Sequence, residues 1–214
     1  FPMDILTQEQ WLLNAQAKFD ALKKKIWEDS QAGIRIDQEE RDAFAELQTI
    51  GLMLLQGFAA GAGVGDEGAQ VTRGERTLRR SDELHEKVYR SVFGTFSIRR
   101  WVYAAGPKKK IEYVPTDARL GLPRGECSYV LEDWQQRLCV KETFAEGVDG
   151  LGAVLGVSMS VETAEAMNRR LAEYAEPFRL QQPAPPAAAE ETFVVATADG
   201  TSVPMHWADR TTTP

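Results

Sequence analysis

The stretch "SVFGTFSIRRWVYAAGPKKKIEYVP", residues 91–115, decides the fold class of this chain. β-Branched and aromatic residues dominate it, and residues of these types are typical of strands. The segment AAGPKK at 104–109 places a glycine and a proline between two apolar runs, which indicates a turn between two strands. The sequence therefore predicts a β-ribbon here, within a chain whose other long segments favour helices.

Two helices are predicted before the ribbon. Residues 4–29 carry apolar residues every three or four positions, which is typical of an amphipathic helix. A second helix should begin near Asp37, which with Glu40 resembles a capping box, and it should end around Gly57. We therefore expect an α+β fold that opens with a helical region over residues 1–60.

Two segments are predicted to be linkers. The glycine-rich stretch "GAGVGDEGAQ" at 61–70 lacks a following Gly-Lys-Ser/Thr and a preceding strand, so it favours a flexible joint over a phosphate-binding loop. The stretch "QQPAPPAAAEET" at 181–192 has proline and alanine without periodicity, which is typical of a stiff linker. The expected organisation is a helical region at 1–60, a linker at 61–75, a basic β-ribbon region at 76–126, a helical module at 127–180, a linker at 181–192 and a new domain from 193 to 214.

Positive charge is concentrated around the ribbon. Residues 73–110 hold eleven basic and four acidic residues, a net charge of +7, which leaves −14 for the rest of a chain whose total is −7. A basic ribbon bearing aromatic residues can contact DNA phosphates, although a hairpin with a solvated charged face has the same composition. The charged stretch around His85 is expected to be helical. The ribbon residues predicted to contact DNA are Arg99, Arg100, Lys108, Lys109 and Lys110.

The helical period returns after Ser128. Apolar spacing predicts helices at 130–138 and 144–155, the second closed by Gly156, and a third helix that Ser160 can cap. A helix, a short turn with glycine and a second capped helix form the layout of a helix-turn-helix, whose second helix enters the major groove of DNA. The residues predicted to contact DNA there are Ser160, Thr163, Asn168, Arg169 and Arg170.

An acidic setting opposes this interpretation. Residues 128–180 contain five basic and nine acidic side chains, a net charge of −4. The alternative is a helical packing subdomain without a role in DNA binding, and the sequence leaves both interpretations open.

Composition excludes several other classes. The two cysteines, Cys127 and Cys139, form no CxxC pair, so a zinc ribbon is not predicted and two reduced thiols are expected. No signal peptide and no run of about 20 apolar residues is evident. With 43% apolar residues, the sequence favours a cytoplasmic protein with a packed core and no membrane partner.

The stretch "FVVATADGTSVPM", residues 193–205, predicts a strand that ends in Asp199 and Gly200. An Asp-Gly pair after an apolar run is a strong hairpin signal, so Asp199 can be a turn residue.

Four pieces in order carry a resemblance. They are "FGTFSIRRWVY" at 93–103, "PTDARLGLP" at 115–123, "FAEGVDGLGAVLGVSMSVETAEAMNRRL" at 144–171 and "VVATADGTSVPM" at 194–205. Over roughly residues 85–205, the chain resembles the N-terminal half of a bacterial DDE-type insertion-sequence transposase, most like the Kra group.

The resemblance implies an RNase H-like catalytic core whose first strand ends in an Asp, which matches Asp199. In that family this Asp, a second Asp and a Glu hold two Mg²⁺ ions, which orient a water or a 3′-hydroxyl for attack on a phosphodiester. The second Asp and the Glu would lie beyond Pro214, so residues 193–214 are expected to be the start of a truncated core, inactive by itself.

The resulting hypothesis is a DNA-binding portion of a transposase. It would bind double-stranded DNA at the terminal repeats of an insertion sequence, while the parent enzyme would use Mg²⁺ for strand cleavage and transfer. The hypothesis is compatible with a homo-oligomer. Two alternatives stay open: a stand-alone DNA-binding remnant or regulator without catalysis, and a helical interaction protein.

Overall fold

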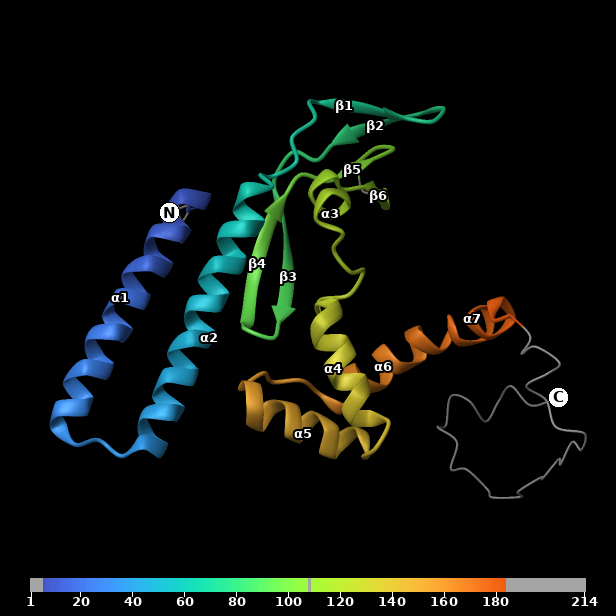
Figure 1. Ribbon diagram of the computed structural model, residues 1–214. Coiled ribbons are helices and arrows are strands. Elements are labelled where there is room, and N and C mark those ends of the chain that lie inside the picture. Colours follow the sequence, from blue (N-terminus) through green and yellow to red (C-terminus); the bar gives the residue numbers. More distant parts are fainter. Residues whose placement is uncertain (1–5, 108, 184–214) are drawn as a thin grey trace, which may run out of the picture. The chain divides into compact units, whose positions relative to one another are not determined.

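The computed structural model describes residues 6–107 and 109–183, and it has a mixed α+β architecture, as the sequence predicts (Figure 1). The described residues fall into two compact units, residues 6–171 and residues 172–183. Lys108 and the predicted strand at 193–205 with Asp199 lie outside the described residues.

Two long helices form an antiparallel pair at the start of the first unit. Helix α1 spans Gln8–Ala32, and α2 spans Ile36–Gly61. A capping box of Thr7 and Gln10 begins α1, because each side chain accepts a hydrogen bond from the other's backbone N–H. Gly33 ends α1 with a left-handed φ of 71°, a conformation that glycine adopts without strain.

The start of α2 differs from the prediction. Its N-cap is Arg35, so Asp37 and Glu40 both lie inside the helix and do not form the expected capping box. Asp37 still lies in the first turn, where a carboxylate interacts favourably with the helix dipole. The helix also continues to Gly61, past the predicted end at Gly57.

The two helices pack along a narrow seam. Ala15, Leu22 and Ile50 form its buried core, with Met53 packed against them. The helices approach closely at Gly57, where an added Cβ would lie 3.2 Å from the Cβ of Trp11. The seam therefore depends on small residues as well as on apolar ones.

By length and composition, α2 could also cross a membrane. This was not predicted, because no run of about 20 apolar residues is evident in the sequence. Core helices of water-soluble proteins share these properties, and α2 packs against α1.

Strands form two small antiparallel sheets in the described part of the chain. The larger sheet has the order β1-β2-β5-β6, and β3 pairs with β4 in the smaller sheet. The strands are β1 (Gln70–Arg73), β2 (Arg76–Arg80), β3 (His85–Ser91), β4 (Gly94–Arg100), β5 (Tyr103–Ala104) and β6 (Ile111–Tyr113).

The predicted turn is confirmed, since β5 pairs with β6 across residues 105–110. The prediction of a helix around His85 is wrong, because His85 lies in β3 opposite Arg100. Strand structure also begins earlier than predicted, with β1 inside the expected linker at 61–75. There Gly74, with a φ of 60°, lies in the tight turn that joins β1 to β2.

The glycine-rich segment is held in place, whereas a flexible joint was predicted. Thr116 donates a hydrogen bond to the carbonyl of Gly63, and Arg119 donates one to the carbonyl of Ala62. Tyr103 accepts a bond from the backbone N–H of Glu67 and donates one to the carbonyl of Gly68. These bonds tie the segment to β5 and to α3 (Pro115–Leu120).

The β3–β4 turn packs on α2. The ring of Phe93 lies against Gly51, where an added Cβ would come within 2.5 Å of a ring carbon. Any larger residue at Gly51 would have to displace the ring of Phe93. Gly51 therefore couples the helical pair to the smaller sheet.

Three helices complete the first unit: α4 (Tyr129–Cys139), α5 (Phe144–Leu155) and α6 (Val161–Ala172), with the last residue of α6 in the second unit. The predicted helices are confirmed here. Ser128 caps α4, and Thr143 with Glu146 forms a capping box for α5. In the second unit, α7 (Ala175–Gln181) carries an ion pair of Arg179 with Glu176.

The three helices share one hydrophobic core. Its buried residues are Cys127, Leu131, Leu151, Val157, Met159, Ala164 and Met167. Residues from all three helices and from the α5–α6 connection contribute to it. The segment before α4 also bonds to β3, because the N–H of Arg90 donates to Glu126 and the N–H of Ser128 donates to Arg90.

Candidate nucleic-acid interface

The β1–β2 ribbon carries the most exposed arginines of the sheets. Arg73, Arg76 and Arg79 are all exposed, and Arg73 lies opposite Arg76 at the turn. Because side chains alternate along a strand, Arg76 shares a face with buried Leu78, and Arg79 lies on the other face. The ribbon therefore presents guanidinium groups on both faces.

Aromatic rings orient two arginines of the ribbon, Arg73 and Arg80. The guanidinium carbon of Arg73 lies 3.8 Å from the ring centroid of Tyr113, and that of Arg80 lies 4.4 Å from the ring of Trp101. A stacked guanidinium keeps its N–H edges available for hydrogen bonds. Arg80 uses one such edge to bind Asp66, whereas Arg73 has no carboxylate partner among the described residues.

The other two ribbon arginines differ in their partners. Arg76 lies 3.3 Å from Glu112 in an ion pair whose arginine is 75% exposed, so solvent screens it strongly. Arg79 has no ion-pair partner in the described part of the chain. Both guanidinium groups are accessible to a phosphate.

The two predicted arginines on β4 occupy different environments. Arg99 lies opposite Glu86 in the β3–β4 register, is half-buried, and forms no ion pair with a described residue. Arg100 donates a hydrogen bond to Asp117 at 2.8 Å, and its side chain is only 12% exposed. Burial raises the pKa of Asp117, and the charge of Arg100 opposes that shift. This geometry gives Arg100 a structural partner.

Two of the three predicted lysines lie in the β5–β6 turn. Lys109 and Lys110 are exposed there, and the Lys109 N–H donates to the carbonyl of Gly106 at 3.2 Å. Lys108 falls outside the described residues. Lysines at an exposed turn next to the β1–β2 ribbon extend the positive surface of the same sheet.

The predicted contact residues of α6 also divide by their partners. Ser160 accepts a hydrogen bond from the N–H of Thr163, so its hydroxyl caps the helix. Arg169 is exposed and lies 3.9 Å from Glu165, whereas Arg170 pairs with Glu132 of α4, whose side chain is 6% exposed.

Asn168 is half-buried, and Glu162 is exposed at the start of α6. Hydrogen bonds from its own backbone and from Ser160 lower the pKa of Glu162. Its carboxylate therefore stays charged at the end of α6 that would approach DNA. Two arginines on α6 were predicted to contact DNA. Of these, Arg169 can exchange its exposed partner Glu165 for a phosphate more readily than Arg170 can exchange the buried Glu132.

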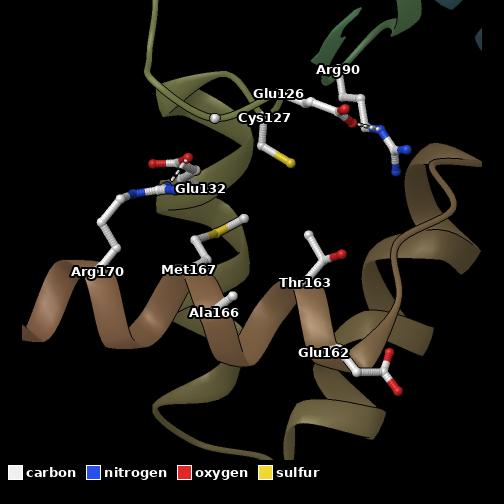
Figure 2. Close-up of a pocket in the computed structure, with 10 residues that line it drawn as sticks. Arg90, Glu126, Cys127, Glu132, Glu162, Thr163, Ala166, Met167 and Arg170 are labelled. Carbon is white, nitrogen blue, oxygen red and sulfur yellow. Dashed lines mark hydrogen bonds and ion pairs between the residues drawn. The ribbon is translucent and has the colours of Figure 1, made fainter. Parts of the chain in front are cut away.

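A cavity of about 420 Å³ lies between α6, β3 and the segment before α4. Figure 2 shows the residues that line it. Arg90 lies 3.2 Å from Glu126 on one side, and Arg170 pairs with Glu132 on the other. Each cation already faces a carboxylate, so the cavity offers no free positive charge. Burial raises the pKa of Cys127, so its thiol stays protonated at neutral pH and is a poor nucleophile.

No group of three or more His, Cys, Asp or Glu side chains within residues 6–107 and 109–183 could hold a metal ion. The resemblance assigns one metal ligand, Asp199, which lies outside those residues. One carboxylate by itself does not make the two-metal site that the resemblance implies.

Sequence reasoning missed the β1–β2 arginines as site residues. Arg73, Arg76 and Arg79 contribute to the positive charge of 73–110, but the predicted linker at 61–75 separated the first from the others. The signal that could have found them is "TRGERT", in which a glycine-containing pair joins two short alternating runs.

The described residues thus form a mixed α+β protein with an exposed basic ribbon and a three-helix module. No family model, curated protein or solved structure matches this chain.

Proposed function

We propose that this chain is the DNA-binding portion of a DDE-type transposase, which recognises the ends of an insertion sequence. The observation that supports this most directly is the cluster of exposed arginines on the β1–β2 ribbon. A two-stranded ribbon fits the major groove of B-DNA, and arginines that bind phosphates release condensed counterions. Arg73 and Arg79 form no ion pair with a described carboxylate. A phosphate could therefore bind either arginine without displacing a carboxylate.

The three-helix module supports a second contact. Helices α5 and α6 are joined by the short segment 156–160 and share one core with α4, which is compatible with a helix-turn-helix. Arg169 is exposed on α6, but Glu162 and Glu165 lie on the same helix. In this proposal the ribbon supplies affinity through phosphates, and α6 supplies discrimination between sequences.

Catalysis belongs to the parent enzyme in this proposal. Asp199 would be one ligand of an Mg²⁺ pair that supplies strand cleavage and transfer, together with acids that this chain does not offer. A reading frame that continues past codon 214 with a further Asp and Glu would favour the transposase over a stand-alone regulator.

Salt dependence tests the DNA-binding proposal. We expect the affinity of the full chain for a labelled duplex, measured by fluorescence anisotropy, to fall as salt rises, because phosphate contacts release counterions. Arg79→Ala should weaken binding severalfold at low salt for every duplex sequence.

Arg137→Ala is the matched control, because Arg137 is also an exposed arginine, pairs with Asp133 on α4 and lies outside the ribbon. Equal losses in the two variants would show that net charge, and not the ribbon, determines binding. Affinity that does not change with salt would exclude phosphate contact.

A comparison of duplex sequences tests the division of roles. Arg169→Ala should reduce the preference for an element end over a scrambled duplex, whereas Arg99→Ala should weaken both complexes alike. The same pattern in both variants would contradict separate roles for α6 and for β4, the strand that carries Arg99.

A further inference from the structure

The α1–α2 pair has two unlike edges beside its buried seam. One edge is ionic, since Lys18 lies 2.7 Å from Glu46 and Lys25 contacts Asp29 and Asp42. On a helical wheel of α1, the two lysines lie on one side of the buried residues Ala15 and Leu22. Apolar residues lie on the other side. We call that side the apolar edge. It consists of Leu12, Phe19, Ile26, Leu47, Leu54 and Phe58.

Spacing along the apolar edge follows a seven-residue repeat. Leu12, Phe19 and Ile26 recur every seven residues on α1, and Leu47 and Leu54 do so on α2. A repeat of seven keeps side chains along one line of a helix, which is the pattern of helices that pack against further helices. These side chains flank the seam, yet the pair alone does not cover them.

The exposure of this edge is large. Its six side chains are between 40 and 65% exposed, and Trp27 and Phe44, which border it, are 66 and 47% exposed. With ~150–250 Å² for a fully exposed side chain of this size, the eight together present on the order of 600–1,000 Å². A standard protein interface buries about 800 Å² on each partner.

We propose that the apolar edge binds the same edge of a second copy of this chain, so that two α1–α2 pairs form a four-helix bundle. The edge is self-complementary, because both of its rows are apolar and helical, and a two-fold axis brings like surfaces together. The available area matches what a stable dimer requires. Four-helix bundles bury such seven-residue rows in their centre.

Charge argues against a lipid surface as the occupant. Residues 8–61 carry six basic and nine acidic residues, a net charge of −3. Helices that lie on anionic membranes have basic polar faces instead. The same negative charge also opposes DNA as the partner of this edge, so the proposal is separate from the DNA-binding function.

Sedimentation velocity of the full chain over a range of concentrations tests the dimer. We expect a monomer–dimer equilibrium with a Kd on the order of micromolar for an interface of this size. Phe58→Lys and Trp27→Lys place a charge near each end of the edge and should each raise the Kd at least about tenfold. Both side chains are about two-thirds exposed, so circular dichroism should show unchanged folding.

Val154→Lys is the matched control, because Val154 is 64% exposed but lies on α5. Its Kd should equal that of the wild type. A wild-type chain that stays monomeric at about 100 μM, well above the expected Kd, would overturn the proposal. A dimer that Phe58→Lys leaves intact, or that Val154→Lys weakens equally, would also overturn it. Flotation of a monomer with neutral lipid vesicles would assign the edge to a membrane instead.

Discussion

Arg79 and Arg100 differ in what their guanidinium groups contact, although both lie in strands of the basic region. Arg100 is bound to Asp117 and is almost fully covered, whereas Arg79 is exposed without a described carboxylate partner. A phosphate could bind Arg79 without breaking a protein contact. To bind Arg100, it would have to replace Asp117 and leave a partly buried carboxylate unpaired.

Replacement of Arg100 should therefore affect stability before it affects binding. We expect Arg100→Ala to lower the free energy of unfolding by about 1–3 kcal/mol, because Asp117 loses its partner. Urea unfolding measures this, and DNA binding of the folded variant should keep the wild-type salt dependence. A variant of unchanged stability that loses salt dependence would assign Arg100 to the DNA contact.

Because the pKa of Asp117 is raised in the folded state, the stability loss of Arg100→Ala should depend on pH. Burial raises the pKa of folded Asp117 above its unfolded value, so the folded state favours the protonated form. Its stabilising contribution is present below about pH 4 and is lost as the pH rises through the folded pKa. The stability deficit of Arg100→Ala should accordingly be smaller at acidic pH, where Asp117 needs no cation.

Sequence alone located the basic residues but could not assign their partners. The positive charge of residues 73–110 is visible as composition, whereas the pairing of Arg100 with Asp117 depends on how α3 packs beside β4. The same holds for Arg170, whose partner Glu132 lies 38 positions away. Ion pairs between distant residues have no local signature, so two of the predicted DNA contacts have structural partners.

At the scale of elements, the Arg170–Glu132 pair joins α6 to α4. Glu132 is nearly buried, so Arg170→Ala would leave a charge without compensation inside the three-helix module. We expect a loss of about 2–3 kcal/mol in the free energy of unfolding, less than for a fully buried pair because Arg170 is one-third exposed.

Chemical unfolding of Arg170→Ala and of the double variant Glu132→Gln with Arg170→Met tests this account. The double variant should recover most of the loss, because no unpaired charge remains. Arg169→Ala should leave stability unchanged, since Arg169 is exposed. Equal losses in Arg169→Ala and Arg170→Ala would contradict the structural role of Arg170.

The ionic edge of the α1–α2 pair predicts acid sensitivity. Hydrogen bonds from Lys25 lower the pKa values of Asp29 and Asp42, and these bonds also raise the pKa of Lys25. Carboxyls with lowered folded pKa values stabilise the fold above about pH 4, and this contribution is lost as the pH falls through the folded values.

Lys25→Met should therefore flatten the acid side of the stability profile. In thermal unfolding between about pH 2 and pH 6, the wild-type midpoint should fall more steeply than that of Lys25→Met. Lys24→Met is the control, because Lys24 is exposed and, among the described residues, pairs only with Glu28, at 3.5 Å. Parallel profiles for wild type and Lys25→Met would show that Lys25 does not couple to these carboxyls.

The helices and strands differed in how closely the sequence predicted them. Helices with clear apolar spacing and caps, such as α5 with Thr143 and Glu146, are predicted within a few residues. The short strand β3 was missed, because its charged residues obscure the alternation around Val88 and Tyr89. It is stabilised by pairing with β4, including an edge-to-face contact of Tyr89 with Phe96 at 5.5 Å between ring centroids.

For the whole molecule, charge and apolar surface are segregated. The basic strands contrast with a helical pair whose net charge is −3, so the two surfaces suit partners of different chemistry. A dimer through the apolar edge would bring two ribbons into one complex, and a two-fold complex would bind two equivalent DNA half-sites. The charge contrast is visible in the sequence. The exposure of the apolar edge is visible only in the structure, because it depends on how the two helices pack.

The salt dependence of duplex binding tests the central claim most directly. For wild type, we expect the logarithm of the association constant to fall linearly with the logarithm of the salt concentration, with a slope of about −0.9 for each phosphate contact. The double variant Arg76→Ala with Arg79→Ala should have a slope that is smaller in magnitude by about 2. A double variant with the wild-type slope, or a wild type without salt dependence, would contradict DNA binding by the β1–β2 ribbon.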